Sequence, residues 1–118
     1  MSTNADLITA ELLTIFGERD ASKRLEAMGR LYTDDITFAD HEGVVSGFEA
    51  INAKIEALLA GAPGFVFTVA GPVHEVQDLA TLDWNFGPTG QAPVVSGTDI
   101  VTVRDGRIAT LHAYLRSS

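Results

Sequence analysis

The chain has no cysteine among its 118 residues, which excludes disulfide bonds, a thiolate nucleophile and cysteine-based zinc sites. Basic residues are scarce too, because 8 Lys and Arg stand against 16 Asp and Glu, for a net charge of −8. Such a chain is poorly suited to nucleic-acid backbones or anionic membranes, and we expect neither as a partner. The histidines His41, His74 and His112 show no metal-binding spacing, so we expect neither a metal nor another cofactor.

Long hydrophobic runs are also absent. No apolar stretch approaches the roughly 20 residues of a transmembrane helix. The segment 1–13 lacks the basic start and unbroken apolar stretch of a signal peptide, so we expect a cytoplasmic location. With 46% hydrophobic residues, residues 1–118 are expected to form a single domain with one core.

The spacing of the apolar residues that are present predicts three helices in the first half of the chain. The expected starts and ends are Thr3 or Asn4 to Gly17, Asp20 to Tyr32, and Ser46 to Gly61, with Ser46 and Glu49 spaced as a capping box.

From residue 65 onward the pattern alternates as in strands. Strands are expected over 65–70, 79–86, 93–104 and 107–115, in addition to a short earlier strand that ends at Asp40. Asp105-Gly106 between the last two is a strong hairpin signal. Helices grouped early and strands grouped late predict an α+β fold, with three helices on one face of a curved antiparallel sheet.

The stretch 31–43, LYTDDITFADHEG, contains the first candidate for chemistry. Asp34 and Asp35 are expected to form the turn that follows the second helix. Ile36, Phe38 and Asp40 then share one face of a strand, so an apolar row ends in a carboxylate. Asp40 either lines a pocket, which we favour, or turns into solvent at the strand end.

Asp99 is the stronger anomaly. In the strand VVSGTDIVTV it shares a face with Val95, Gly97, Val101 and Val103. Burial among apolar side chains raises the pKa of a carboxyl group, so Asp99 could stay protonated and donate a hydrogen bond. The alternative is a structural Asp bonded to the backbone or to a hydroxyl such as that of Thr81 or Tyr32.

The order of elements, with LYTDDITFAD after the second helix and DGRIATLHAYL at the end, resembles the NTF2-like fold. The resemblance is closest to the ketosteroid isomerase and SnoaL-like polyketide cyclase groups. It implies a cone that encloses an apolar cavity, with Asp40 as the general base. It also implies that Asp99 is an oxyanion donor, as in the isomerases, or a general acid/base, as in the cyclases.

One position departs from the isomerase pattern. Phe16 stands where the resemblance places the oxyanion-hole tyrosine, and Phe cannot donate a hydrogen bond. Losing one such donor typically lowers the rate by about 10²–10³-fold. The residues expected to contact a ligand are Phe16, Tyr32, Phe38, Trp84, Val101 and Leu111.

Three functions remain open at this point. The first is proton transfer on a small hydrophobic carbonyl compound in a closed cavity, with Asp40 as base and Asp99 as acid or oxyanion donor. The second is a non-catalytic domain that binds a small ligand. The third, epoxide hydrolysis, is least favoured because Arg104, Arg107 and Arg116 all lie at strand ends and none lies between two acids.

A homodimer is also expected. Val94, Thr98, Ile100, Thr102, His112 and Tyr114 fall on the sheet face opposite the cavity. Three helices cannot cover both faces, and a contiguous apolar patch usually marks an interface.

Overall fold

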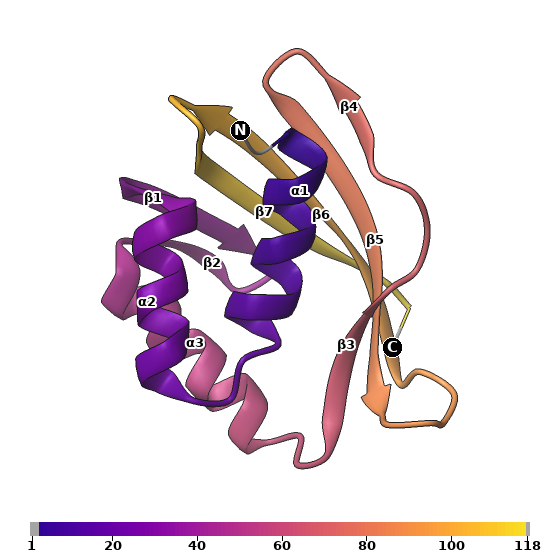
Figure 1. The fold of residues 1–118 in the computed structure, drawn as a ribbon. Coiled ribbons are helices and arrows are strands. Elements are labelled where there is room, and N and C mark those ends of the chain that lie inside the picture. Colours follow the sequence, from indigo (N-terminus) through magenta and orange to yellow (C-terminus); the bar gives the residue numbers. More distant parts are fainter. Residues whose placement is uncertain (1–2, 118) are drawn as a thin grey trace.

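The computed structural model describes residues 3–117, which form three α-helices and seven strands (Figure 1). The helices are α1 (Asn4–Glu11), which continues as the π-helix η1 (Leu12–Phe16), α2 (Ala21–Leu31) and α3 (Phe48–Ala60). The strands are β1 (Tyr32–Asp40), β2 (Gly43–Ser46), β3 (Phe65–Val69), β4 (His74–Val76), β5 (Leu79–Pro88), β6 (Val95–Arg104) and β7 (Arg107–Ser117). The predicted α+β class is confirmed.

All seven strands belong to one sheet. Its order is β2-β1-β7-β6-β5-β3, and β4 pairs with β5 outside this path. The pairs are antiparallel except that β1 runs parallel to β7, with Phe38 opposite Leu111. The first strand therefore lies beside the last one, which the prediction of an antiparallel sheet did not include.

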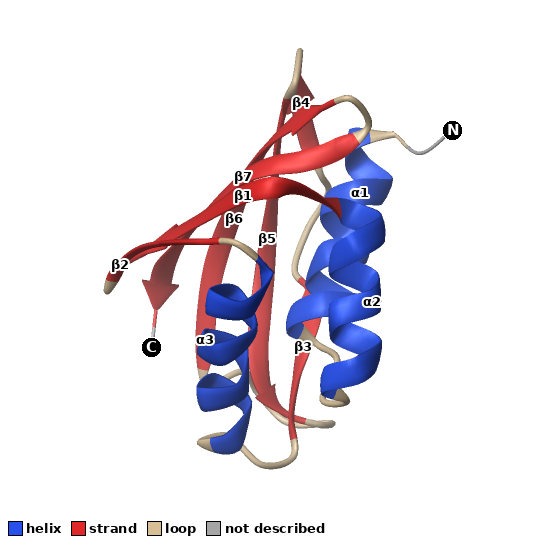
Figure 2. Ribbon diagram, turned by 90° about the vertical axis from the view of Figure 1, so that its left-hand side faces the viewer, coloured by secondary structure: helices blue, strands red, loops and turns tan. Residues whose placement is uncertain are grey.

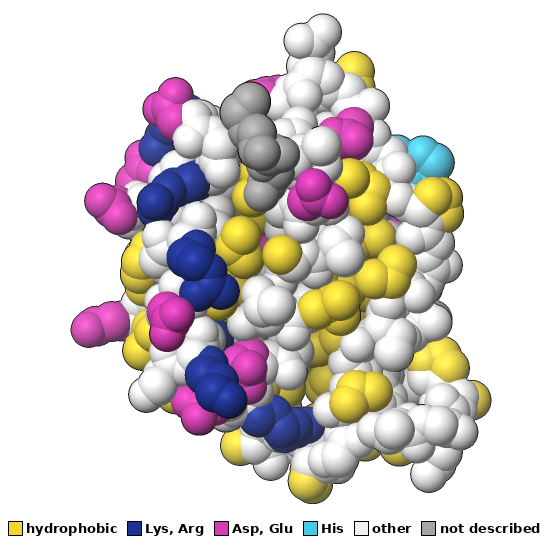
Figure 3. All heavy atoms as spheres, viewed as in Figure 1, with side chains coloured by type: hydrophobic (Ala, Val, Ile, Leu, Met, Phe, Trp, Pro, Cys, Tyr) yellow, Lys and Arg dark blue, Asp and Glu magenta, His cyan; other side chains and the backbone are white. Residues whose placement is uncertain are grey.

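The helices lie on the concave face of the sheet. Figure 2 shows α1 and α2 side by side, and α3 beneath the end of the sheet formed by β1 and β2. In the space-filling view of Figure 3, charged side chains of both signs lie over the side of α2, and apolar side chains lie between α1 and the strands.

Local sequence signals fix the starts of the first two helices. Thr3 and Asp6 form a capping box at α1, and Asp20 accepts a hydrogen bond from the Lys23 backbone N–H at α2. The capping box predicted at the third helix is wrong. Gly47, with a φ of 86°, is the N-cap of α3 and provides no side-chain hydrogen bond.

One further expectation, about the start of β1, is wrong. Asp34 and Asp35 lie within β1 and not in a turn, and Asp35 pairs with Arg104 at 2.6 Å. The short strands β2 and β4 were not expected. Asp105 and Gly106, with φ of 53° and 76°, do form the predicted two-residue turn between β6 and β7.

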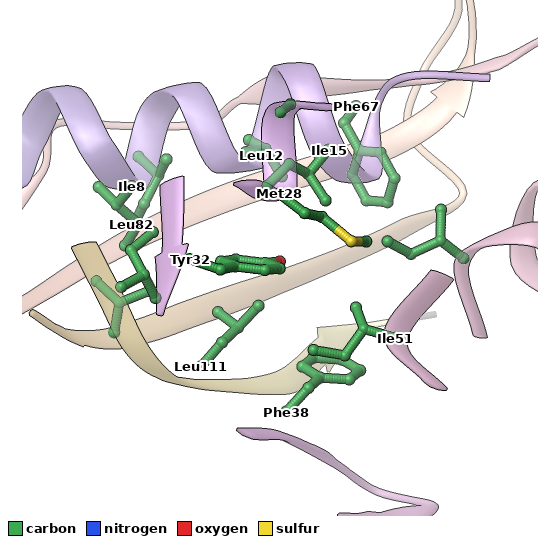
Figure 4. Close-up of a cluster of buried hydrophobic side chains, with 14 of the residues drawn as sticks. Ile8, Leu12, Ile15, Met28, Tyr32, Phe38, Ile51, Phe67, Leu82 and Leu111 are labelled. Atoms are coloured by element: carbon green, nitrogen blue, oxygen red, sulfur yellow. The ribbon is translucent and has the colours of Figure 1, made fainter. Parts of the chain in front are cut away.

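Buried apolar side chains from both layers form one core (Figure 4). Ile8, Leu12 and Ile15 come from the first helical segment, and Leu82 and Leu111 come from β5 and β7. These residues have the helical and alternating spacings from which the helices and strands were predicted, so periodicity identified most of the core.

Arg24 links α2 to α3 although its side chain is only 1% exposed. Its guanidinium donates to Asn52 Oδ1 at 2.7 Å and to Glu56 Oε1 at 2.6 Å. It also donates to the backbone oxygen of Glu18. These charge-assisted bonds hold α3 against α2, and α3 carries part of the site described below.

The convex face of the sheet is bonded by side-chain pairs across strands. Thr98 donates to Asp83, and Thr102 pairs with Thr110. Tyr114 and Val94 are each about half exposed, at 51% and 50%, and Ile100 is half-buried. No helix of residues 3–117 covers this face, so the expected homodimer stays a prediction.

If two copies pair through this face, Ile100→Glu should convert the dimer into a monomer, because it buries a charge in the interface. Light scattering at micromolar concentration measures the change. Leu25→Glu on α2 is the matched control, since Leu25 is exposed on another side of the molecule. A monomeric wild type would refute the pairing.

Candidate functional site

A pocket of about 790 Å³ lies between α3, η1 and the concave face of the sheet. Most of its lining side chains are apolar, and the aromatic part of the wall is formed by the rings of Phe16, Phe38, Phe65, Phe67, Trp84 and Phe86. The pocket is partly open to solvent, whereas a closed cavity was expected. Its volume is that of pockets that hold drug-sized molecules.

The aromatic wall is built by several elements that are far apart in sequence. Phe16 at the end of η1 packs against Phe38 of β1 and Phe67 of β3, with ring centroids 5.4 and 6.2 Å away. Phe67 in turn stacks on Phe86 of β5 at 4.2 Å. These tilted, edge and offset contacts are the favourable geometries of aromatic pairs, and they hold the rings in place.

The polar side chains of the pocket are Asp40, His41, Glu42 and Lys54. The Lys54 ammonium lies 2.9 Å from Asp40 Oδ2 and 3.0 Å from Glu42 Oε1. The Asp40 carboxylate also accepts a hydrogen bond from the Glu42 backbone N–H at 2.9 Å. The end of β1, its following turn and α3 thus bring a carboxylate and an ammonium together beside the aromatic wall.

Asp40 is a carboxylate at neutral pH. Partial burial alone would raise its pKa, but the hydrogen bonds from Lys54 and from the Glu42 backbone outweigh burial and lower the pKa below its usual value. The side chains of Lys54 and Asp40 are 22% and 13% exposed. Asp40 lines the pocket, as expected, but its partner Lys54 was not foreseen.

Asp99 lies deeper. It is 4% exposed and accepts a hydrogen bond from the Trp84 indole N–H at 2.8 Å, not from Thr81 or Tyr32. Burial raises the pKa of Asp99 to about 7, although the indole hydrogen bond acts in the opposite direction. The expected burial and raised pKa are both present, but Trp84, and not Asp99 itself, lines the pocket.

A second buried carboxyl group, Glu11, was missed in the sequence. Glu11 is completely buried and accepts a hydrogen bond from the Tyr32 hydroxyl at 2.9 Å, while its Oε2 has no partner. Burial, and then the charge of Asp99, raise the pKa of Glu11 well above its usual value. Its position four residues after Leu7 and three after Ile8 placed it on the apolar helix face, which was the available signal.

The residues predicted to line the pocket therefore fall into two groups. Phe16, Phe38, Trp84 and Asp40 do line it. The remaining residues, Tyr32, Val101, Leu111 and Asp99, are buried in the core and do not line it. Sequence periodicity places a residue on the inner face of a strand, but it does not tell whether that part of the face lies under the pocket or under α1.

Side chains suited to hold a metal ion are not gathered here. Within residues 3–117, no group of three or more His, Asp or Glu side chains is arranged for coordination. The same part of the chain contains no helix with the length and hydropathy needed to cross a membrane.

The sequence profile of the SnoaL-like domain family matches residues 11–111. The chain belongs to this family. No curated protein sequence matches it with significant similarity. The isomerase and cyclase resemblance is thus confirmed for the family and for the NTF2-like fold, without fixing the activity of this SnoaL-like protein.

Solved structures share the fold. A SnoaL-like family protein from Agrobacterium tumefaciens has 24% identity and a TM-score of 0.86, over 94% of this chain and 95% of its own. A protein with a ketosteroid isomerase-like fold from Catenulispora acidiphila, in complex with trimethylamine, has 21% identity and a TM-score of 0.74, over 95% of this chain and 86% of its own. A candidate SnoaL-like polyketide cyclase from Jannaschia has 14% identity and a TM-score of 0.76, over 98% and 90%.

Gly97 allows the contact between Trp84 and Asp99. Gly97 lies opposite Trp84 in the β5–β6 pairing, and a Cβ at Gly97 would lie 2.3 Å from the indole. Gly97→Ala should therefore displace the ring and lower the free energy of unfolding by about 1–3 kcal/mol. Chemical denaturation followed by Trp84 fluorescence measures both effects.

Gly29→Ala is the control, because a Cβ there meets nothing within 4 Å in a helix and should stabilise the chain slightly. Equal stabilities of wild type and Gly97→Ala would contradict the close approach.

The raised pKa of Asp99 predicts a pH dependence of stability. The folded chain holds the Asp99 proton up to a pKa of about 7, whereas the unfolded chain releases it near the ordinary Asp value. The contribution is therefore fully present below about pH 4 and is lost as pH rises toward 7.

Between pH 4 and 8, the denaturant midpoint should fall less with rising pH in Asp99→Asn than in wild type. Some of the fall should remain in the variant, because Glu11 is not altered. Identical pH dependence in both proteins would show that Asp99 is ionised throughout.

Proposed function

We propose that the protein catalyses proton transfer at carbon on a small, mostly apolar molecule that carries a carbonyl group. The observation that carries this proposal is a partly buried carboxylate, Asp40, at the polar end of an aromatic pocket. An apolar ring system would contact the aromatic wall, and its carbonyl end would lie beside Asp40. A positioned carboxylate base contributes roughly 10²–10⁴-fold to such a reaction.

In this proposal Asp40 removes a proton from the carbon next to the carbonyl, and the electrons of that C–H bond form an enolate. Return of the proton to another carbon gives an isomerisation. Attack of the enolate carbon on a second carbonyl carbon forms the new C–C bond of a cyclisation, and the resulting alkoxide takes the proton from Asp40. Both outcomes are consistent with the isomerase-like and cyclase-like structures that share the fold.

Asp99 has an indirect role in this scheme. It holds the Trp84 indole, one wall of the pocket, through the 2.8 Å hydrogen bond. Trp84 is the only tryptophan of the chain, so its fluorescence reports on ligand binding and on this wall together. The direct contact of Asp99 with a ligand oxygen, which the resemblance implies, would need Trp84 to move aside.

A non-catalytic binding domain is the second candidate. It is favoured by the pairing of Asp40 with Lys54, because a carboxylate with a lowered pKa is a weaker base than a free one. In that case Asp40 and Lys54 would only orient the polar end of the ligand.

Asp40→Asn separates the two functions. If Asp40 is the base, isomerisation of a 3-oxo-Δ5 steroid, followed by the absorbance of the conjugated product, should fall by about 10²–10⁴-fold. Steroid affinity, measured by Trp84 fluorescence, should change only a few-fold because Asn has nearly the same shape.

Asp35→Asn is the matched control, since Asp35 is an exposed carboxylate on the same strand and does not line the pocket. If the wild type binds carbonyl compounds but exchanges none of their α-protons in deuterated water, the protein is a binding domain and not an enzyme of this kind.

A further inference from the structure

The proposed reaction places negative charge on the ligand oxygen, and the pocket needs a donor for it. Phe16 has no hydrogen to donate, and Asp99 lies behind Trp84. The polar side chains that line the pocket are two carboxylates, His41 and Lys54. Lys54 is the one that carries a permanent positive charge.

Lys54 contacts two carboxylates and one aromatic ring. Its Nζ atom lies 3.1 and 2.9 Å from the two Asp40 oxygens and 3.0 Å from Glu42 Oε1. The same atom lies 5.6 Å from the centre of the Phe38 ring, within the range of a cation–π contact. Hydrogen bonds to Asp40 Oδ1 and Glu42 Oε1 use two of the three N–H donors of the ammonium, and the third, which lies near Asp40 Oδ2, is the one that would turn to a ligand oxygen.

The contact between Lys54 and Asp40 matches the shape of a carbonyl ligand. In such a ligand the acidic hydrogen and the carbonyl oxygen are attached to adjacent carbons. A base can take the hydrogen while a donor binds the oxygen only if the base and the donor are neighbours in the pocket. We propose that Lys54 is a catalytic residue that donates a hydrogen bond to the ligand's carbonyl oxygen while Asp40 takes the α-proton. This inference rests on the proposed function.

The step balances without any further reactant. The C–H electrons become the C=C bond of the enolate, the carbonyl π electrons move to oxygen, and the proton moves to Asp40. Returning that proton to carbon restores the carboxylate. Because the negative charge moves from one neighbour of Lys54 to another, the ammonium keeps an anionic partner throughout, in a site where charges are partly shielded from water.

The pKa of Lys54 agrees with this role. Burial lowers it, but the hydrogen bonds and charges of Asp40 and Glu42 outweigh burial and raise the pKa above its usual value. Lys54 therefore stays a cation at neutral pH, and a donor is always present. The acidic partners that face it are Asp40 from β1 and Glu42 from the turn before β2.

The test uses 2-naphthol, a flat aromatic alcohol whose ionised and neutral forms fluoresce differently, in the Asp40→Asn background. The uncharged amide of this variant imitates a base that has taken its proton, and bound naphtholate imitates the enolate oxygen. We expect the bound alcohol to ionise at a pH at least about one unit lower than in water, and Lys54→Met to abolish that shift. Lys54→Arg, which keeps the charge, should retain part of it.

Activity gives a second readout. With Asp40 intact, Lys54→Met should lower kcat for the 3-oxo-Δ5 steroid by about 10²–10³-fold, as for other lost oxyanion donors, with a smaller change in KM. It should also move the acidic limb of the pH–rate profile upward, because Asp40 loses the ammonium that lowers its pKa. A lysine that only paired with Asp40 would still move the profile, because it lowers the Asp40 pKa, but its loss would leave the naphthol shift unchanged in the Asp40→Asn background.

The outcomes are distinguishable. A naphthol shift that survives Lys54→Met and disappears in His41→Phe would overturn the proposal in favour of His41. The proposal would also be overturned if naphthol ionised as in water both in the Asp40→Asn protein and in its Lys54→Met variant. If the naphthol shift depends on Lys54 but the protein has neither steroid isomerase nor proton-exchange activity, Lys54 is supported as a hydrogen-bond donor to the ligand oxygen. In that case the proposed enzymatic function fails. Lys54→Gln with an unchanged circular dichroism spectrum serves if Lys54→Met does not fold.

Discussion

The hydrogen bond from the Trp84 indole to Asp99 connects the wall of the pocket to the buried core behind it. On one side of the ring is the open pocket, and on the other is a carboxyl group whose hydrogen-bond partner is that uncharged indole. Gly97 makes the arrangement possible, because any side chain there would occupy the space of the indole. A buried carboxyl group is tolerated only with a hydrogen-bond donor or a proton, and Asp99 has access to both.

The polar end of the pocket, in contrast, consists of charged side chains that pair with one another. Asp40 and Lys54 come from a strand end and from the middle of α3, and each is the other's main charged neighbour. The position of α3 depends in turn on the buried guanidinium of Arg24, which bonds to Asn52 and Glu56 on that helix. Burial raises the pKa of the core carboxyl groups Glu11 and Asp99, whereas the hydrogen bonds from Lys54 and the Glu42 backbone lower the pKa of Asp40 at the rim. Two separate electrostatic environments thus meet at one aromatic wall.

Much of this arrangement could be predicted from the sequence. Periodicity indicated the helices, the main strands, the burial of Asp99 and the inner-face position of Asp40, because each follows from local spacing. What could not be predicted depends on contacts between distant segments. Lys54 looks like an ordinary exposed helix lysine, and the parallel pairing of β1 with β7 leaves no local signal. Glu11 did carry a signal, since it interrupts an apolar helix face.

The pairing of β1 with β7 has a consequence for synthesis of the protein. Phe38 and Ala39, just before Asp40, lie beside Leu111 and His112 in the sheet. On the ribosome, β1 emerges long before its neighbour exists, and a lone strand with β2 makes at most a marginal hairpin. The Asp40 end of β1 therefore reaches its place only when β7 has left the exit tunnel. Until then the nascent chain exposes an unpaired apolar strand edge, and such edges are prone to pair with other chains.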